Sequence, residues 1–573
     1  MAVATSATPT ARRSFSLPPW ASGLLGVVGI VVVWWVIALV TAPAAGTTYA
    51  AVPTPPQVVQ VAIEDGFGFY WRNFSVTIGE AAVGYFWGNL IALVLSALVL
   101  VVPWLEGVVS QLAVVTYCVP IVAIGTLVLL ILGGADAPGQ PSATAIFLAG
   151  LSVFFTTVVG SLLGLKAADK ASLDVVTVYG GTRLTQLRKV RLIAALPNIL
   201  SALQIAVPAA FLGAILGEYF GKIETGVGPI LVAAQVSLNS PRVWALFLLC
   251  AGVALLGYAI VGLIGRVVAL VLRQGSLIMT TTAGDRTVQS TETSILAVDE
   301  LRRQLRNAAL GATLKSLRKS ALIALSTVVI VLVIWIGIIL FSGVSPYVIK
   351  GPWDVWEHLV TDESAAAHRA ELGGLFAVTM GDSFIGFAAG LVAAIVVAIL
   401  FRLSKGIEHA LMPFALLLRS VPLIAMAPLI ILVFGQGTVA SVAVVGGIVV
   451  LFPALVTIAF GLNNASPQML DVVSVYGGST FTAIRKVAIP GALPSLFAAI
   501  RISVPGAITG ALLAEWLSTG NGIGGTISAW SAQAKFDDVW SAVVLVTGVS
   551  LILYMVVQVV ETFVLSRMSL SLS

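Results

Sequence analysis

The sequence predicts an all-α polytopic membrane protein with about 12 transmembrane helices, each needing roughly 20 apolar residues to cross a bilayer. Hydrophobic residues make up 59% of the 573 residues and charged residues only 10%, well below the roughly 25% charged residues of soluble domains. The second half of the chain repeats motifs of the first half in the same order. The predicted fold is therefore two parallel six-helix repeats in one chain.

Uncharged runs in the first half have the length of a membrane span. They cover about 21–40, 81–102, 112–132, 145–165, 198–217 and 243–265. The run at 21–40 has a signal peptide as its alternative, because the Ala42-Pro43-Ala44 that follows resembles a cleavage site. Its length of about 20 residues exceeds the 7 to 15 of a signal peptide's apolar core, so we favour a retained span.

The second half has the same layout. Its uncharged runs cover about 320–342, 383–401, 411–434, 439–461, 495–514 and 539–560. The domains are then a first half at 1–272 and a second half at 320–573, joined by a polar cytoplasmic linker at 273–319. Within the linker, residues 301–319 carry six Lys or Arg among leucines and alanines. This pattern predicts a basic amphipathic helix on the membrane surface, with a solvated linker helix as the alternative.

The distribution of Lys and Arg predicts the orientation, since cytoplasmic loops of membrane proteins are rich in these residues. Basic residues gather after the fourth span of each half, as in Arg188-Lys189 and Arg485-Lys486, in the linker, and near the C-terminus at Arg567. A cytoplasmic N-terminus places all of these segments in the cytoplasm. We expect a multi-pass protein of the plasma (inner) membrane with both termini cytoplasmic, whose surroundings are the lipid bilayer and whose partners do not include nucleic acid.

One repeated motif organises the chain. Asp174-Val-Val-Thr-Val-Tyr-Gly-Gly181 returns as Asp471-Val-Val-Ser-Val-Tyr-Gly-Gly478, with seven of eight residues identical. In the second copy Ser466-Pro467 favours a helix start, and the glycine pair favours its end because glycine adopts the left-handed conformation. We expect a short helix, a glycine corner and a basic helix, which together suit a push from a soluble partner. The alternative is a turn needed only for folding.

The motif resembles the E-A-A, three residues, G, nine residues, I-x-L-P signature of the permease subunits of bacterial ABC importers, in the branch of the nitrate, sulfonate and taurine permeases. Asp471-Val-Val takes the place of E-A-A, Gly477 is the signature glycine, and Val487-Ala-Ile-Pro490 closes the signature. The first copy has Ile193 where the proline is expected. Further matches are Arg419-Ser-Val-Pro422, Ala427-Pro428-Leu429, Glu515-Trp516 and Gly522-Ile-Gly524.

The resemblance implies the type I ABC importer permease fold and a chain that fuses two permease halves. It implies that loops 166–197 and 462–494 dock on two separate ABC ATPase subunits and that an extracytoplasmic solute-binding protein delivers the solute. The residues expected to couple to the ATPase are Asp174, Tyr179, Gly180, Gly181, Asp471, Tyr476, Gly477, Gly478 and Pro490. ATP-driven closure of the partners would switch the halves between inward-facing and outward-facing states.

The chain itself has no sequence signal for an enzyme. The ATP-binding motif G-x-x-x-x-G-K-[ST] does not occur in it, so we expect no cofactor on this chain, with ATP and Mg held by the partner subunits. No catalytic residue is predicted. The histidines and cysteines, which a metal site would need in a cluster, are isolated from one another: His358, His368, His409, Cys118 and Cys250.

Ionisable residues within or beside the predicted spans are candidates for the transport path. Glu80 and Asp382 occupy equivalent positions and either line a central cavity or lie solvated at headgroup level. Arg501 contacts either solute or a structural carboxylate such as Asp382, and its counterpart is Gln204. Glu218 and Glu515 precede glycine-rich turns, where they seal an outer gate, contact a binding protein or serve as interfacial anchors. The candidates for the path are Glu80, Asp382, Gln204 and Arg501, and those for the outer gate are Glu218 and Glu515.

Two other classes of transport protein are weaker alternatives. A secondary transporter of the twelve-span kind would be expected to carry a G-x-x-x-D-R-x-G-R-R-like loop after its second span, and residues 103–110 do not match it. A channel has no repeated filter sequence to support it. The branch suggests a small organic solute, either a sulfonate-like or nitrate-like anion or a vitamin precursor or heterocycle.

Overall fold

The structure is a computed structural model that describes residues 19–41, 49–221, 224–274, 322, 325–326, 328–404, 406–408, 411 and 423–567. Within these ranges every regular element is a helix. The first half contains α1 Pro19–Val40, α2 Pro55–Val101, α3 Leu105–Cys118, α4 Ile121–Leu132, α5 Ala143–Lys166, α6 Lys170–Val178, α7 Arg183–Gln186, η1 Leu187–Arg191, α8 Leu192–Phe220, α9 Val227–Val236 and α10 Ser240–Gln274.

The second half has the same order of elements after a helix at Val328–Phe341. It contains α12 Pro352–Trp356, η3 Glu357–Thr361, α13 Ala365–Leu403, α15 Leu423–Phe434, α16 Val439–Asn463, α17 Pro467–Val475, α18 Thr480–Ala483, η4 Ile484–Ala488, α19 Ile489–Gly491, α20 Leu493–Ala514, η5 Glu515–Thr519, α21 Gly522–Ala532 and α22 Phe536–Arg567. Residues 275–319 of the predicted linker, with its basic helix, and the segment Arg419-Ser-Val-Pro422 lie outside the described residues, and α10 includes the first two linker residues.

The described part of the chain contains eight helices long and apolar enough to cross a membrane, and a bent pair makes a ninth candidate. Shorter apolar helices at Gly26–Val40 and Val328–Phe341 coincide with the predicted first span of each half. Side chains on the outer faces of the helices, such as Trp87, Leu263 and Val392, are more than half exposed. Exposed apolar belts of this size fit a lipid environment, and the predicted polytopic all-α class is confirmed.

Three predicted spans differ from the structure in extent or shape. α2 begins at Pro55 and not at about 81, and α13 begins at Ala365 and not at about 383. The charged residues before each apolar run interrupt the hydropathy but are themselves helical, since a helix can carry charge on one face. α2 is kinked among them at Gly66, where φ is +76°. The span expected at 112–132 is broken at Val119-Pro120, and α3 and α4 meet at 95°.

Glycine allows the helices of each half to pack closely. In the first half Gly84 and Gly88 of α2 face α5, and a side chain at Gly88 would meet the backbone of Gly150. In the second half Gly386 of α13 meets Gly446 of α16 in the same way. Small residues at such crossings let membrane helices approach to backbone contact. The two halves therefore use the same packing at the same step of the chain.

Contacts between the halves are reciprocal. α4 packs against α20, α21 and α22, and its counterpart α15 packs against α8 and α10. Buried residues from both halves, including Leu216 and Leu512, belong to one apolar core. Reciprocal packing of equivalent helices is the mark of a pseudo-two-fold axis between the halves.

Stacked tryptophans attach the first helix of each half to the bundle. Trp34 of α1 stacks on Trp244 of α10 with ring centroids 5.0 Å apart, and Trp335 stacks on Trp540 of α22 at 5.4 Å. The indole N–H of Trp34 donates to the carbonyl of Pro53 at 3.0 Å. Each pair lies within one half, at the periphery of the molecule.

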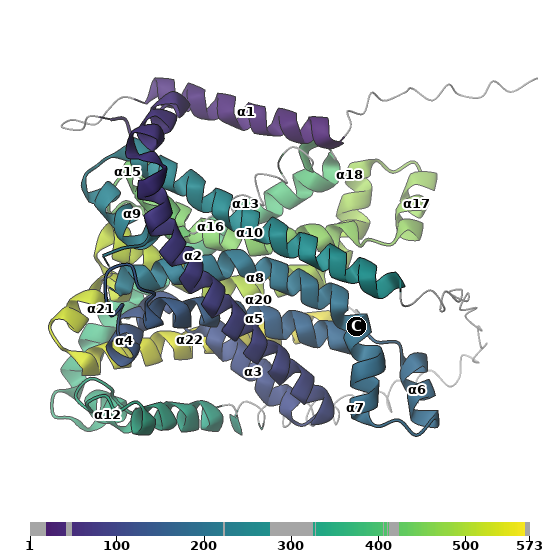
Figure 1. Cartoon of the computed structure of the whole chain (residues 1–573). Coiled ribbons are helices and arrows are strands. Elements are labelled where there is room, and N and C mark those ends of the chain that lie inside the picture. The colour runs from purple at the N-terminus through teal and green to yellow at the C-terminus, as the bar shows by residue number, and fades with distance from the viewer. Residues whose placement is uncertain are drawn as a thin grey trace, which may run out of the picture.

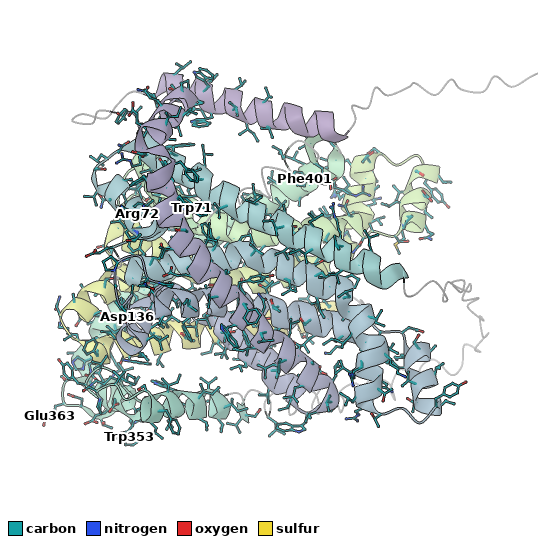
Figure 2. All side chains as sticks on the ribbon, viewed as in Figure 1. Trp71, Arg72, Asp136, Trp353, Glu363 and Phe401 are labelled. Carbon is teal, nitrogen blue, oxygen red and sulfur yellow. The ribbon has the colours of Figure 1, made fainter. Side chains whose placement is uncertain are left out.

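The two repeated loops project from one end of the bundle. Figure 1 shows α6 with α7 and α17 with α18 side by side beyond the bundle, at the end that the last turn of α10 also reaches. Figure 2 shows Trp71, Arg72, Asp136, Trp353 and Glu363 toward the opposite end. Both repeats therefore have the same direction along the bundle, as a parallel duplication requires.

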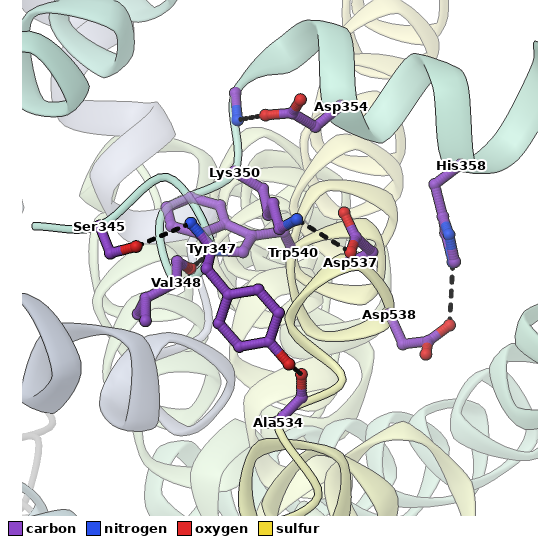
Figure 3. Close-up of polar contacts among 11 residues, drawn as sticks. Ser345, Tyr347, Val348, Lys350, Asp354, His358, Ala534, Asp537, Asp538 and Trp540 are labelled. Atoms are coloured by element: carbon purple, nitrogen blue, oxygen red, sulfur yellow. Dashed lines mark hydrogen bonds and ion pairs between the residues drawn. The ribbon is translucent and has the colours of Figure 1, made fainter.

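Polar contacts at this opposite end tie the segment 345–361 to the start of α22 (Figure 3). The ammonium of Lys350 lies 3.0 Å from the carboxylate of Asp537, and the His358 ring lies 2.9 Å from that of Asp538. The indole of Trp540 donates to the carbonyl of Val348 at 3.0 Å. These contacts hold the connection between the first two spans of the second half against the bundle.

Candidate functional site

The first repeated loop has a capped helix, a glycine turn and a second capped helix. Asp169 caps α6 by accepting from the backbone N–H of Ser172 at 3.3 Å. Gly180 ends the helix at φ +72°, and Thr182 caps α7 by accepting from the N–H of Thr185 at 3.4 Å. Capping side chains satisfy the free N–H groups at a helix start and so fix where each short helix begins.

The second repeated loop has the same geometry. α17 starts at Pro467, and Gly477 adopts φ +74° after it. Ser479 then caps α18 by accepting from the N–H of Thr482 at 3.3 Å. The structure differs from the sequence analysis in one detail, because the Ser466 hydroxyl bonds to Gln468 and not to a backbone N–H of α17.

The two glycines of each pair have different roles. Gly180 and Gly477 supply the positive φ that side-chain-bearing residues avoid. Gly181 has no such φ, but a methyl group on it would overlap the side chain of Val176. Gly478 lies against Val473 in the same manner. The turn thus needs the first glycine for its backbone angle and the second for close approach.

Each loop ends in an exposed apolar tip. Tyr179 and Tyr476 are each 87% exposed, and Val178 and Val475 are each 83% exposed. Equal exposure at equivalent residues shows that the two tips present the same surface. We call these four residues the valine–tyrosine tips. Apolar side chains raised into solvent on a small polar loop are typical of a surface that a partner protein covers.

The loops leave the tips in two ways. In the first copy η1 continues directly into α8. In the second copy the three-residue helix α19, which contains Pro490, separates η4 from α20. Proline removes a backbone donor and interrupts a helix. The difference between Ile193 and Pro490 in sequence therefore becomes a difference in the geometry of the loop exit.

Glu218 forms a buried clasp at the far end of α8. Its side chain is 1% exposed and accepts from the hydroxyl of Thr77 and from the N–H of Gly228, the latter at 2.7 Å. The Thr77 oxygen also accepts from the N–H of Val227 at 3.0 Å. A buried carboxylate is costly unless it is hydrogen-bonded, and here α2 and the first turn of α9 supply the donors.

Glu515 forms the same clasp in the second half. It is fully buried, and its carboxylate accepts from the Thr379 hydroxyl at 3.0 Å and from the N–H of Gly524 at 2.8 Å. The N–H of Ile523 donates to the Thr379 oxygen at 3.0 Å. A side chain at Gly522, where φ is +67°, would collide with the Glu515 carboxylate. We call these two arrangements the first clasp and the second clasp.

Sequence analysis selected the glutamates and glycines of both clasps but missed Thr77 and Thr379. These threonines are equivalent residues of α2 and α13, and their recurrence in both halves was the available signal. The clasps bury Glu218 and Glu515 between helices, so neither carboxylate is exposed at a surface. This location differs from an interfacial anchor or a direct contact with a binding protein.

Glu80 and Asp382 have different environments although they are equivalent in sequence. Glu80 is fully buried and accepts from the N–H of Ser142 at 2.6 Å. Asp382 is partly exposed. Because α2 and α13 extend well beyond these residues on both sides, neither stands at a helix start. Glu80 is therefore not solvated at headgroup level.

Arg501 forms an ion pair with Glu561 of α22, at 3.1 Å, and lies over the ring of Tyr554. The partner is thus Glu561 and not the Asp382 suggested by the sequence. The reason is that Arg501 faces the last helix of its own half. Gln204 also faces the last helix of its own half, where its amide donates to the carbonyl of Tyr258 in α10 at 3.2 Å.

Metal ligands do not cluster in the described residues, where no group of three or more His, Cys, Asp or Glu side chains could hold an ion. The two cysteines, Cys118 and Cys250, are buried. The rings of His358 and His368 stack with their centroids 3.9 Å apart, and His358 contacts one carboxylate, that of Asp538.

Comparison with known proteins identifies the two halves. The family model described as "Binding-protein-dependent transport system inner membrane component" matches residues 84–274 and again residues 386–570. A probable ABC transporter permease protein of Haemophilus influenzae is 28% identical over 225 residues, which are 39% of this chain and 89% of that relative. Since that relative is nearly covered by part of this chain, it corresponds to one permease half.

Other relatives carry more specific names. A formylaminopyrimidine transport permease protein of Halalkalibacterium halodurans is 29% identical over 26% of this chain and 58% of its own length. The taurine transport system permease protein of Escherichia coli is 21% identical over 41% of this chain and 86% of its own length. All of these relatives are named as permeases. The chain belongs to the binding-protein-dependent transport system inner membrane component family, the permeases of ABC transporters, and carries its domain twice.

Proposed function

We propose that this chain is the transmembrane subunit of an ATP-driven importer, with two permease halves fused. It forms the solute path between the halves by alternating access. Two separate ATPase subunits drive it through the repeated loops, and an extracytoplasmic solute-binding protein supplies the solute. The single observation that carries this proposal is the pair of matching valine–tyrosine tips at one end of the bundle.

The tips support ATPase docking for a physical reason. Each exposes a valine and a tyrosine at the end of a short helix that a glycine turn follows, so the two side chains are presented on a defined backbone. An aromatic anchor of this kind typically fills a pocket on a partner. The tips are equivalent, so one kind of ATPase subunit could bind both. Under this proposal the loops, the linker and both termini are cytoplasmic.

The solute is proposed to be a small organic molecule. Relatives are named for the transport of formylaminopyrimidine and taurine, and another for riboflavin. Arg501, the cationic candidate for the path, is already paired with Glu561. An arginine whose charge is balanced by a carboxylate attracts an anion less strongly, and on this ground we favour a vitamin precursor or heterocycle over a small inorganic anion.

The test is reconstitution in liposomes. The chain is purified with its ATPase subunits, and ATP hydrolysis is measured with and without the chain, with vanadate as inhibitor. We expect Tyr179→Ala combined with Tyr476→Ala to release the ATPase subunits. Tyr347→Ala is the matched control, because Tyr347 is also exposed, at 60%, but lies toward the other end of the bundle.

Two results would contradict the proposal. One is accumulation of solute by the chain alone under an ion gradient, which would indicate a secondary transporter. The other is retention of the ATPase subunits by the double tyrosine variant. The solute class is tested separately, by thermal-shift measurements of the solute-binding protein with taurine, a formylaminopyrimidine and riboflavin.

A further inference from the structure

Three aromatic side chains from the two halves meet at the ends of α8 and α20. The ring of Trp516 lies 4.3 Å from that of Tyr219 and 4.6 Å from that of Phe220, measured between centroids. It stacks on Phe220 with an interplanar angle of 17° and meets Tyr219 edge-on at 69°. We call these three residues the aromatic plug.

The plug lies on the pseudo-two-fold axis. Tyr219 and Trp516 are equivalent residues, because each directly follows the glutamate of its clasp. Equivalent points lie at equal distances on opposite sides of a two-fold axis, so equivalent rings that touch must both lie beside it. Trp34 and Trp335 are also equivalent, but each stacks on a tryptophan of its own half. Their contacts therefore do not place them beside the axis.

The position of the plug along the axis follows from the length of α8. This helix has 29 residues, which at 1.5 Å each span roughly 43 Å. It starts at the first repeated loop and ends at Phe220. A bilayer's hydrocarbon core is about 30 Å thick. The plug is therefore a full membrane thickness away from the valine–tyrosine tips, at the opposite mouth of the interface between the halves.

The clasps hold the plug in place. Glu218 and Glu515, the residues before Tyr219 and Trp516, are fixed by hydrogen bonds to α2 and α13. Phe220 packs separately against α4. Its ring lies so close to Gly125 that a methyl group added there would overlap it. Movement of α2 or α13 is thereby transmitted to the plug through one buried carboxylate in each half.

We propose that Tyr219, Phe220 and Trp516 are the gate that closes the transport path at the end opposite the repeated loops, and that the clasps position it. The inference rests on the proposed function, in which solute passes between the two halves. Solute moving along the axis meets these rings, so Trp516 must separate from Tyr219 and Phe220 once in each cycle. The buried glutamates are positioning residues and the aromatic rings are the barrier.

The test is a reversible cross-link across the axis. Cysteines replace the two equivalent rings in the variant Tyr219→Cys with Trp516→Cys, in a chain that also carries Cys118→Ala and Cys250→Ala. A short bis-methanethiosulfonate reagent joins them in the complex with its ATPase subunits. The matched control is Trp34→Cys with Trp244→Cys, a stacked pair at 5.0 Å within one half.

We expect the axial cross-link to lower ATP hydrolysis by the complex at least tenfold and a reducing agent to restore it. The control pair should cross-link without this loss. An axial cross-link that leaves hydrolysis unchanged would overturn the gate. A single Trp516→Cys variant adds a second measurement, because a membrane-impermeant maleimide should label it faster after vanadate trapping than at rest, and equal labelling would also overturn the gate.

Failure of the gate and failure of the proposed function are distinguishable. If no ATPase subunit binds, the proposed function fails whatever the cross-link does. The cross-linking yield in membranes does not depend on ATP, so absence of the axial cross-link, with the control pair formed normally, contradicts the axial contact itself. Loss of both cross-links would show that the chain without Cys118 and Cys250 is misfolded. The maleimide labelling of Trp516→Cys is then made in the chain that keeps Cys118 and Cys250, which are both buried. That measurement decides whether the gate opens.

Discussion

Alanine at Gly477 should weaken binding of the ATPase subunit, while alanine at Gly491 should not. Both glycines lie in the second repeated loop, and a methyl group at either position would meet no atom within 4 Å. They differ in backbone angle, because Gly477 has φ +74° and Gly491 lies in the helix α19. The comparison therefore isolates the left-handed conformation from steric contact and from the chemistry of the new side chain.

The magnitude follows from the backbone angle. A Cβ in the left-handed region costs about 1–2 kcal/mol, which corresponds to a factor of about 5 to 30 in an equilibrium constant. If the turn must be intact for docking, the Kd of the ATPase subunit should rise by that factor in Gly477→Ala. Helical alanine is favoured over glycine by up to about 1 kcal/mol, so Gly491→Ala should bind as the wild type or slightly better.

The assay is titration of purified ATPase subunit onto the chain in nanodiscs, with far-UV circular dichroism to confirm that each variant is folded. Gly180→Ala should reproduce the effect in the first loop, because Gly180 has the same angle, φ +72°. Equal affinities for Gly477→Ala and Gly491→Ala would refute the reasoning, since docking would then not depend on the shape of the turn.

Three further predictions test other parts of the structure. Tyr476→Ala alone should release one of two ATPase subunits, which native mass spectrometry of the complex measures. Thr379→Val should lower the melting temperature in detergent, because it removes one of the hydrogen bonds to the Glu515 carboxylate and leaves the buried N–H of Ile523 without its acceptor, at about 1–3 kcal/mol for the unsatisfied group; an unchanged melting temperature would contradict the second clasp. Arg501→Gln should destabilise more than Arg501→Gln combined with Glu561→Gln, since an unpaired buried charge costs about 3–5 kcal/mol, and equal melting temperatures would argue against the ion pair.

Much of the repeated loops could be predicted from the sequence because their signals are local. A glycine pair at the end of an eight-residue motif, followed by Ser479 or Thr182, determines where one helix ends and the next begins. Those features depend on neighbouring residues in the chain. The fold class was equally accessible, since long apolar runs have few alternatives to membrane helices.

The lengths of the membrane helices were harder to predict from the sequence. The length of an uncharged run shows where charged residues occur but not toward which side of a helix they point. Residues such as Glu64, Asp65 and Arg72 end an uncharged run, yet α2 includes them, with a kink at Gly66 and with Asp65 paired to Arg242. The bend at Pro120 is a similar case. Proline disfavours helix at the residue before it, and a break there was predictable, but the 95° angle between α3 and α4 is not specified by the local sequence.

Contacts between residues far apart in the chain could not be predicted from local sequence patterns. No sequence feature near Arg501 in α20 indicates that its ion-pair partner is Glu561 in α22. Thr77 resembles any helical threonine until Glu218 is seen beside it. The repeat offers one remedy, because a polar residue kept at equivalent positions in both halves, as Thr77 and Thr379 are, is constrained twice and deserves selection as a site candidate.

The differences between the halves separate mechanical parts from those that would meet the solute. The repeated loops and the clasps are nearly the same in both halves, as parts that receive and transmit one symmetric motion should be. The interior is unequal, because Glu80 is buried where Asp382 is partly exposed, and Tyr219 faces Trp516 across the axis. Under the proposed function, a path with unequal walls presents different groups to the two sides of a solute. We therefore expect one bound orientation of an asymmetric molecule, and fusing the halves in one chain guarantees that every path has one wall of each kind.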